Sequence, residues 1–270
     1  MTFWLTLAAG WLAMVVAMGI LWQVQRTYGK AGIVDVLWAA GVGVLGVLFA
    51  LLGDGYPPRR LLIGLLIGGW SLRLTLYLFV RVLGMAEDGR YEAMKRKWGA
   101  KTQTYLFAFF QVQAFWSVLF AAPVLIAAGN AAAPLGLLDA AGVAVFVIAV
   151  FGELTADRQL QAFRSNRANR GKVCRSGLWR YSRHPNYFFE WIHWWAYVLI
   201  GWHAPFGWAT LFGPAIMLLF LFKVTGIPPT EENALRSRGD AYREYQRTTS
   251  VFFPWPPKPD RSDKERTAIA

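Results

Sequence analysis

The stretch YLFAFFQVQAFWSVLFAAPVLIAA, from Tyr105 to Ala128, decides the fold of this chain. It contains no Asp, Glu, Lys or Arg, and a helix needs about 20 apolar residues to cross the hydrocarbon core of a bilayer. Six more apolar segments have the same character: Phe3–Trp22, Val34–Leu52, Leu61–Val82, Leu135–Leu154, Phe188–Trp202 and Phe206–Thr225. The sequence therefore predicts an all-α, polytopic integral membrane protein with seven transmembrane helices. The segment at Phe188 is short, so we expect its helix to begin nearer Asn186.

The composition agrees with a membrane protein. Of the 270 residues, 56% are hydrophobic and 16% are charged, whereas an ordinary soluble domain carries about 25% charged residues. The single cysteine, Cys174, cannot form an intramolecular disulfide, and no metal site is predicted. We expect one seven-helix domain over residues 1–255 and a disordered polar tail over residues 256–270.

The connections between the apolar segments alternate in charge. Alternate loops and the C-terminal tail hold 23 Lys and Arg residues, whereas the opposite loops hold only Arg59 and Arg60. Since Lys and Arg accumulate on the cytoplasmic side, this pattern predicts an N-terminus outside and a C-terminus in the cytoplasm. Topology and contact with anionic lipids explain the net charge of +12 better than binding to nucleic acid does.

Glycines at Gly41, Gly43 and Gly46 match the G-x-G-x-x-G pattern of dinucleotide-binding turns. They lie inside an apolar segment, not at a strand-to-helix turn, so the phosphate-binding interpretation does not apply. Close helix packing is the better explanation, as it is for Gly64 and Gly68.

Polar side chains fall at helical spacing within several predicted spans, where an ionisable group costs about 2.5–3.5 kcal/mol, and at the end of the fifth span, whose helix is expected to continue out of the membrane. The stripes are Arg73, Tyr77 and Arg81; Glu153, Asp157, Gln161 and Arg164; and Asn186, Glu190, His193 and Tyr197. Asp35 opens the second span. By the predicted topology, these groups line a polar pocket open to the cytosol. The alternative is buried ion pairing, with Arg73 or Arg81 neutralising Asp35, Glu153 or Glu190, and with His193 as an interhelical hydrogen-bonding group.

The most informative stretch is WRYSRHPNY, from Trp179 to Tyr187. Pro185 suits the first turn of a helix, whose unpaired N–H groups attract anions. Two arginines and two tyrosines flank that turn, so the stretch predicts a site for a phosphorylated nucleotide with aromatic walls.

The segments Gly177–Glu190 and Tyr242–Trp255 resemble the membrane steroid 5α-reductase family, in particular a bacterial branch with largely unassigned substrates. Shorter similar stretches are Val34–Trp38, Glu87–Tyr91, Glu153–Gln159 and Gly226–Glu231. The resemblance implies seven helices around NADPH in the bacterial inner membrane, with the cofactor site facing the cytoplasm. It also implies hydride transfer to the C=C bond of a lipophilic α,β-unsaturated ketone, such as a 3-oxo-Δ4-steroid, that enters from the lipid.

The resemblance, together with the polar stripes, implies roles for individual residues. The expected cofactor-binding residues are Asp157, Arg164, Arg180, Tyr181, Arg183, His184, Asn186, Tyr187, Glu190, Tyr242 and Tyr245. The expected catalytic residues are Tyr77, Glu190 and His193; Tyr77 polarises the substrate carbonyl, and the proton comes from His193 or water. The expected substrate-binding residues are Asp35, Trp38, Arg73 and Tyr77. The glutamate with which the family binds steroid has no counterpart before Gly53, so Asp35 or His193 takes its role or the substrate is not a 3-ketosteroid.

Two alternatives remain open. The Arg-His-Pro-x-Tyr motif followed by Glu is also similar to that of isoprenylcysteine carboxyl methyltransferases, which use S-adenosylmethionine. That cofactor has no phosphates, whereas arginines are dense from Arg158 to Arg183. The second alternative is a non-enzymatic membrane binding protein, which would bind no nucleotide.

Overall fold

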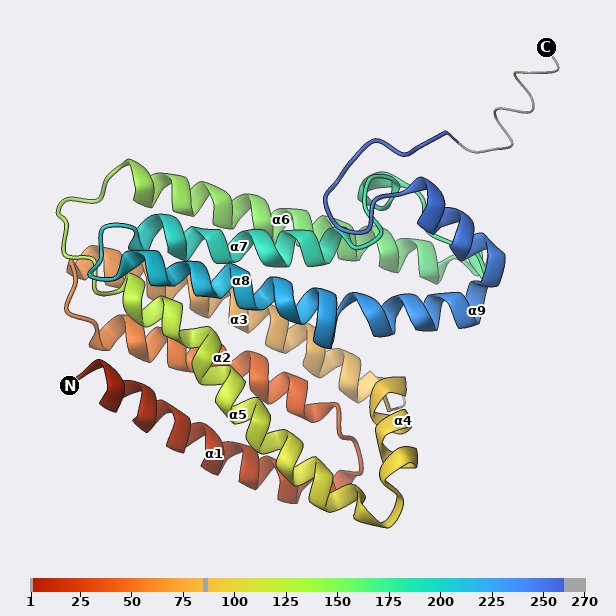
Figure 1. Ribbon diagram of the computed structural model, residues 1–270, viewed down its shortest axis with the longest axis horizontal. Helices are drawn as coiled ribbons and strands as arrows, with labels where there is room; N and C mark the ends of the chain where they lie inside the picture. Colours follow the sequence, from red (N-terminus) through yellow and green to blue (C-terminus); the bar gives the residue numbers. More distant parts are fainter. Residues whose placement is uncertain (1, 85–86, 260–270) are drawn as a thin grey trace. The chain divides into compact units, whose positions relative to one another are not determined.

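The computed structural model describes residues 2–84 and 87–259, and it contains helices and no strand within those ranges. The α-helices are α1 (Phe3–Tyr28), α2 (Ile33–Leu52), α3 (Pro57–Gly84), α4 (Gly89–Trp98), α5 (Thr102–Ala127), α6 (Leu137–Ser165), α7 (Pro185–Gly201), α8 (Phe212–Leu219) and α9 (Ile227–Thr248) (Figure 1). Short 3-10 turns at Gly99–Lys101, Arg167–Asn169, Gly177–Arg180 and Gly207–Leu211, and a π-helical turn at Phe220–Val224, connect them. The all-α fold class is confirmed.

Six helical segments of the described chain are long and apolar enough to cross a membrane: Phe3–Tyr28, Ile33–Leu52, Pro57–Gly84, Gly89–Ala127, Leu137–Ser165 and Gly207–Thr248. Helix α7 is not among them. Its 17 residues span about 26 Å at 1.5 Å per residue, which is less than a hydrocarbon core of about 30 Å. An integral membrane protein is supported, and the seventh span stays a prediction. Pro185 is the first residue of α7, as the sequence predicted.

The chain divides into two compact units, which we describe separately. Unit 1 comprises the chain up to Val143 together with Ala196–Gly213. Unit 2 comprises Ala144–Trp195 together with the chain from Pro214 onward. The boundaries fall inside α6, α7 and α8.

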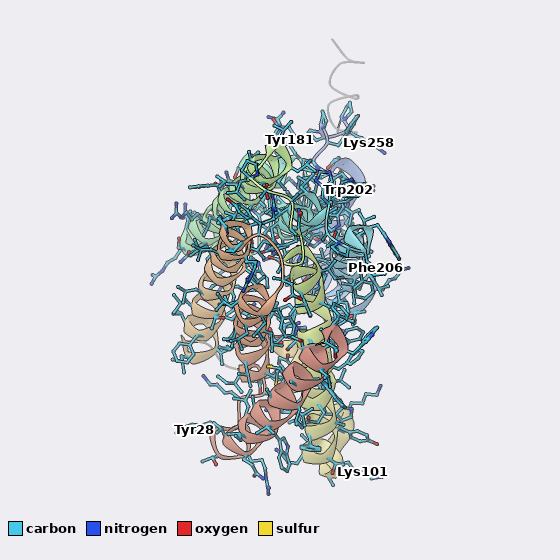
Figure 2. The ribbon with its side chains drawn as sticks, turned by 90° about the vertical axis from the view of Figure 1, so that its left-hand side faces the viewer. Tyr28, Lys101, Tyr181, Trp202, Phe206 and Lys258 are labelled. Atoms are coloured by element: carbon cyan, nitrogen blue, oxygen red, sulfur yellow. The ribbon has the colours of Figure 1, made fainter. Side chains whose placement is uncertain are left out.

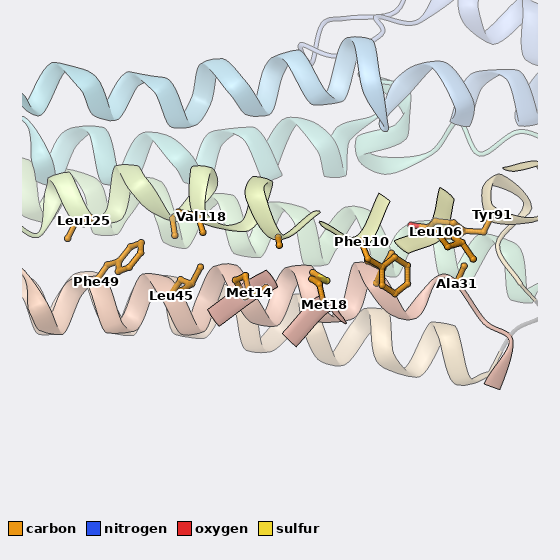
Figure 3. Close-up of a cluster of buried hydrophobic side chains, with 13 residues drawn as sticks. Met14, Met18, Ala31, Leu45, Phe49, Tyr91, Leu106, Phe110, Val118 and Leu125 are labelled. Atoms are coloured by element: carbon orange, nitrogen blue, oxygen red, sulfur yellow. The ribbon is translucent and has the colours of Figure 1, made fainter. Parts of the chain in front are cut away.

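In unit 1, α2 packs against α1, α3 and α5. Buried apolar side chains run along these helices, from Phe49 and Leu125 through Met14 and Met18 to Tyr91 (Figure 3). Burial of apolar surface stabilises this contact at about 25 cal/mol per Å² where the alternative environment is water. Within lipid, close packing takes over that role.

Three glycines on α2 allow side chains of neighbouring helices to pack directly against its backbone. A Cβ on Gly41 would overlap the Met14 side chain, and one on Gly43 would overlap Ser71. A Cβ on Gly46 would lie 2.7 Å from Ile67 Cγ1. These contacts confirm that the G-x-G-x-x-G match serves helix packing. Gly68 is also tight, with Val47 Cγ2 at 3.2 Å, whereas Gly64 has only an ordinary contact with Ala50 at 3.7 Å.

The loops of unit 1 form two sets of contacts. In the first set, the ammonium of Lys30, in the loop between α1 and α2, donates to the carbonyl of Val82 at the end of α3 (2.8 Å). In the other, Gly55 N–H donates to Ala128 O (3.0 Å), and the Asn130 side-chain amide donates to Ile200 O (2.7 Å). The second and fourth connections and the end of α7 are therefore held together. Loops expected on one side of the membrane thus contact each other within this unit.

Arg59 and Arg60, which the sequence placed in the second loop, lie in the first turn of α3, and both form hydrogen bonds. Arg59 is buried and paired with Asp139, and it also donates to the carbonyls of Asn130 and Ala132. Arg60 donates to Ala50 O (3.0 Å) and to Leu51 O, so it satisfies the final carbonyls of α2. Neither of these two residues is a free surface charge.

Aromatic side chains mark the margins of unit 1. Figure 2 shows Tyr28, at the end of α1, and Phe206, after α7, at its edge, where they are 78% and 74% exposed. Exposed aromatic residues at the ends of apolar helices are typical of a membrane–water interface.

In unit 2, α9 is interrupted at Gly239, whose φ of 51° and ψ of −125° are not helical. The side-chain amide of Gln246 reaches Glu231 Oε2 at 2.9 Å. These residues are 15 positions apart, which is about 22 Å along a straight helix, so the interruption folds α9 back on itself. Glycine is required here because other residues are strained at this backbone conformation.

The chain after α9 pairs with the stretch before α7. Arg183 N–H donates to Ser250 O (2.8 Å), Ser182 Oγ donates to Phe252 O (2.8 Å), and Trp255 N–H donates to Tyr181 O (2.9 Å). The Lys258 N–H donates to Thr248 O (2.8 Å), and Tyr181 and Lys258 lie at the same margin of unit 2 (Figure 2). Of the tail predicted over residues 256–270, residues 260–270 lie outside the described chain.

Candidate functional site

The start of α7 organises the candidate site in unit 2. Ser182 Oγ accepts from the backbone N–H of His184 (3.1 Å), and Phe188 N–H donates to His184 O (3.1 Å). The indole N–H of Trp179 donates to Ala156 O on α6 (2.9 Å). The residues that precede α7 are thus held in place by local caps and by α6.

The polar faces of α6 and α7 meet in this unit. The Asn186 side-chain amide donates to Asp157 Oδ1 at 3.2 Å. One turn and a half earlier on α6, Gly152 has no side chain, so the Phe189 ring lies directly against its backbone. Two of the predicted stripes, those of Asp157 and of Asn186, are therefore brought together.

His193 lies about two turns after Asn186 on α7 and is 1% exposed. Its Nδ1 lies 2.7 Å from the backbone carbonyl of Glu190 and 3.6 Å from the Glu190 carboxylate. Because a carbonyl only accepts, Nδ1 carries the proton. The ring packs edge-on against Phe146 on α6, with centroids 6.3 Å apart.

Glu231, on the first part of α9, collects four hydrogen bonds. Its carboxylate accepts from Arg183 Nε (2.6 Å), His184 Nε2 (3.3 Å), Gln246 Nε2 (2.9 Å) and the Tyr242 hydroxyl (3.5 Å). Arg183 Nη1 also donates to the carbonyls of Gln246 (3.0 Å) and Thr249 (2.6 Å). Arg183 therefore ties the stretch before α7 to α9 and the tail.

The environment of His184 keeps its imidazole neutral. Burial lowers the pKa of His184 below its ordinary value of 6.5, and the neighbouring Arg183 acts in the same direction while Glu231 opposes both. The ring stacks on Tyr187 with centroids 5.3 Å apart and planes 4° apart.

Tyr187 and Tyr245 form hydrogen bonds within the site. Thr230 donates its hydroxyl proton to Gly226 O (2.8 Å), so the Tyr187 hydroxyl is the donor in its 3.1 Å contact with Thr230. Tyr245 is buried, and its hydroxyl faces the carbonyls of Trp179 and of Ser182 (3.1 Å). Tyr245 thus fixes the backbone of the stretch before α7 through its hydroxyl group.

The exposed groups of this site are basic. Arg164, Arg180 and Tyr181 are exposed, and Arg180 forms no side-chain hydrogen bond or ion pair with the described residues. No acidic residue occurs between Asp157 and Glu190. A guanidinium in such a surface suits the phosphate of a ligand.

The predicted substrate residues lie in unit 1. Asp35 accepts from the Tyr91 hydroxyl (2.7 Å) and pairs with Arg90 (3.2 Å). Arg81 pairs with Asp88 (2.7 Å). The ion pairing of Asp35 with Arg73 or Arg81 was therefore wrong: the partner is Arg90, one residue past the start of α4, a helix that the sequence reading did not include.

The other three members of this set lie on α2 and α3. Trp38 packs edge-on against Phe120 of α5, with centroids 5.4 Å apart. Arg73 is partly buried, and Tyr77 is 48% exposed. An exposed phenol within an apolar helix is accessible to a lipophilic molecule.

Glu87 and Asp88 cap two helices. The Glu87 carboxylate accepts from the N–H groups of Ala31 (2.7 Å) and Gly32 (3.2 Å) at the start of α2 and from Lys95 (2.5 Å). Burial alone would raise the pKa of Glu87, but these hydrogen bonds outweigh it and hold the pKa below 4.5. Asp88 accepts from Arg90 N–H (2.9 Å) at the start of α4.

Sequence reading missed Glu231 and Gln246 as members of the site, and Arg90 and Tyr91 as the partners of Asp35. Glu231 and the Glu87–Tyr91 stretch were noticed only as similar to a family pattern. The carboxylate of Glu231 accepts from residues far along the chain, and no spacing rule predicts such contacts.

The fold and site define a helical membrane protein with a basic polar region at the start of α7. A family model described as "Protein of unknown function (DUF1295)" matches residues 21–249. The chain therefore belongs to this family, which is a membrane family similar to the 5α-reductases.

One curated relative extends the comparison. An uncharacterized protein of Schizosaccharomyces pombe is 29% identical over 275 aligned residues, which cover 87% of this chain and 76% of that protein. No solved structure matches the chain.

Proposed function

We propose that this protein is an NADPH-dependent membrane reductase that transfers hydride to the C=C bond of a lipophilic α,β-unsaturated ketone. The observation that carries the proposal is the Asn186–Asp157 hydrogen bond, which joins the polar faces of α6 and α7 beside the start of α7. The resemblance to the 5α-reductases assigns these two residues to the cofactor.

The chemistry of the donor set fits a phosphorylated dinucleotide. Arg180 and Arg164 are exposed and basic, and the N-terminal turn of α7 supplies backbone N–H groups. Asn186 and Glu190 supply an amide and a carboxylate for the carboxamide of a nicotinamide ring. NADPH, when bound, supplies the hydride.

The chain's own residues orient and stabilise the reacting groups in this proposal. Tyr77 donates a hydrogen bond to the carbonyl oxygen of the ketone, and Arg73 favours the negative charge that develops there. His193 donates its Nδ1–H to Glu190 O, so a neutral His193 has no proton on Nε2. Water is therefore the better source of the proton that is added at the α-carbon.

We also propose a bacterial inner-membrane location with the N-terminus outside and the cofactor site in the cytoplasm. The hydrogen bonds of Arg59 and Arg60 within unit 1 support this orientation, because neither guanidinium is free to act as a surface charge on the opposite side. The loops with 23 basic residues then face the anionic inner leaflet.

A side-by-side titration tests the function. Purified protein in detergent is titrated with NADPH, NADH and S-adenosylmethionine, and binding is followed by calorimetry. Saturable binding of NADPH supports the reductase. Binding of S-adenosylmethionine alone points to a methyltransferase, and binding of none of the three points to a non-enzymatic protein; either result sinks the proposal.

A further inference from the structure

The hydrogen bonds around Glu231 fix the protonation of His184. Arg183 Nε lies 2.6 Å from Glu231 Oε1, and a carboxylate paired with a guanidinium is ionised at neutral pH. An ionised carboxylate only accepts hydrogen bonds. The 3.3 Å contact between Glu231 Oε1 and His184 Nε2 therefore places the ring proton on Nε2.

The other ring nitrogen of His184 is then an acceptor. Since the low pKa keeps the imidazole neutral, Nδ1 carries a lone pair and no proton. No described residue forms a hydrogen bond with Nδ1. The backbone N–H of His184 is taken by Ser182 Oγ, and the ring is held flat against Tyr187, so the direction of Nδ1 is fixed.

We propose that Glu231 is a positioning residue that holds His184 as the neutral Nε2–H tautomer, so that Nδ1 accepts a hydrogen bond from a hydroxyl or amide N–H of the bound dinucleotide. The ligand part of this inference rests on the proposed function, and the tautomer part does not. A phosphate is excluded as the partner of Nδ1, because an ionised phosphate oxygen is itself an acceptor.

The same contacts indicate different roles for the two arginines of the motif, Arg180 and Arg183. Arg183 donates Nε–H to Glu231 and Nη1–H to the carbonyls of Gln246 and Thr249. Arg180 has no such commitments among the described residues and is exposed. Arg180 is therefore the arginine that would bind a phosphate of the dinucleotide, and Arg183 mainly holds Glu231 in place.

Nuclear magnetic resonance measures the tautomer directly. The chain has three histidines, so protein labelled with ¹⁵N-histidine gives three imidazole patterns, and those of His193 and His203 are assigned with single variants. We expect His184 to show the Nε2–H pattern at pH 7 without any nucleotide. An Nδ1–H or doubly protonated ring would overturn the inference, whatever nucleotide binds.

Substitution of Glu231 tests the positioning role. In Glu231→Gln the new amide can donate as well as accept, so His184 should lose its single tautomer, and NADPH affinity should fall about tenfold, which corresponds to one hydrogen bond of about 1.4 kcal/mol. Glu232→Gln makes the same charge change one residue away, at a side chain that is 63% exposed, and should change neither quantity. Wild-type tautomer and affinity in Glu231→Gln would overturn the role.

Two variants of His184 separate its two nitrogens. In His184→Asn the side-chain amide replaces Nδ1, and in His184→Gln it replaces Nε2. We expect NADPH affinity to fall about tenfold further in His184→Gln than in His184→Asn, and stability to fall further in His184→Asn than in His184→Gln. The opposite ranking of affinities would contradict the assignment of Nδ1. If wild-type protein binds no NADPH, the proposed function fails while the measured tautomer still decides the role of Glu231.

Discussion

The guanidinium of Arg59 and the carboxylate of Asp139 form a buried two-pronged ion pair, with Nε–Oδ1 at 2.6 Å and Nη2–Oδ2 at 2.7 Å. The pair joins the start of α3 to the start of α6 within unit 1. Removing one partner of a buried pair leaves an uncompensated charge.

We therefore expect Asp139→Asn to lower the free energy of unfolding by about 3–5 kcal/mol. Denaturation of the protein in detergent, followed by circular dichroism, measures the loss. Glu92→Gln is the matched control, because its pair with Arg96 is exposed and 3.9 Å long, and it should cost less than about 1 kcal/mol. Equal effects of the two variants would show that the Arg59 pair is not structural.

Gly43 and Gly64 test the packing of α2 and α3. Gly43→Ala places a methyl group on Ser71, and overpacking of this kind costs about 1–3 kcal/mol. Gly64→Ala meets only Ala50 at 3.7 Å and should be neutral or slightly stabilising, because alanine favours the helix. Thermal unfolding of both variants under the same conditions gives the comparison, and a stable Gly43→Ala would contradict the close approach.

Gly239 tests the folded-back form of α9. No side-chain clash limits this position, since a Cβ there meets nothing within 4 Å. Gly239→Ala should still cost about 1–3 kcal/mol, because its backbone conformation is strained for alanine. Gly69→Ala, with the same free space and an ordinary helical backbone, should not destabilise. Loss of the Nε2–H signal of His184 in Gly239→Ala would report loss of the hydrogen bond between His184 and Glu231.

Glu87 predicts a pH dependence of stability. Its pKa in the folded chain lies below 4.5, so its contribution is fully present above the unfolded pKa and is lost as the pH falls through the folded value. Between about pH 5 and pH 3, wild-type protein should lose stability more steeply than Glu87→Gln. Unfolding by denaturant at several pH values measures the two slopes; parallel slopes would remove Glu87 as the cap of α2.

The proposed chemistry predicts that a variant of the group that polarises the substrate lowers the turnover rate without changing NADPH affinity. Glu190→Gln and Asn186→Ala should abolish turnover of an enone in folded protein. Tyr77→Phe should lower kcat by roughly 10²-fold or more with unchanged NADPH affinity, because it removes one donor to the developing oxyanion. Spectrophotometric consumption of NADPH measures the rates. A loss of NADPH affinity in Tyr77→Phe would show that Tyr77 lies elsewhere.

The positions of the apolar helices were predictable because the length of an apolar segment can be read directly from consecutive residues. The predicted segment Val34–Leu52 and helix α2, Ile33–Leu52, differ by one residue, and the start of α7 at Pro185 follows from the missing N–H of proline. Helix α6 runs on to Ser165, beyond the apolar segment that ends at Leu154, as the polar stripe from Glu153 to Arg164 indicated. The polar helices α4 and α9 were missed, because the reading followed apolar segments.

Partners were less predictable than positions. The charge of Asp35 implied a cation, but three arginines of the chain were within reach of any spacing argument, and only the packing of α4 selects Arg90. Glu231 was hidden for the same reason, since its partners Arg183, His184 and Gln246 come from the stretch before α7 and from beyond the break at Gly239.

The Arg59–Asp139 pair also bears on how the chain is made. Asp139 is synthesised 80 residues after Arg59, so at 5–20 residues per second the arginine waits roughly 4–16 s for its counter-ion. During that interval the rest of α3 and helices α4 and α5 are synthesised while the guanidinium at the start of α3 lacks this carboxylate. Biogenesis of this end of the protein is completed only when the start of α6 has been delivered.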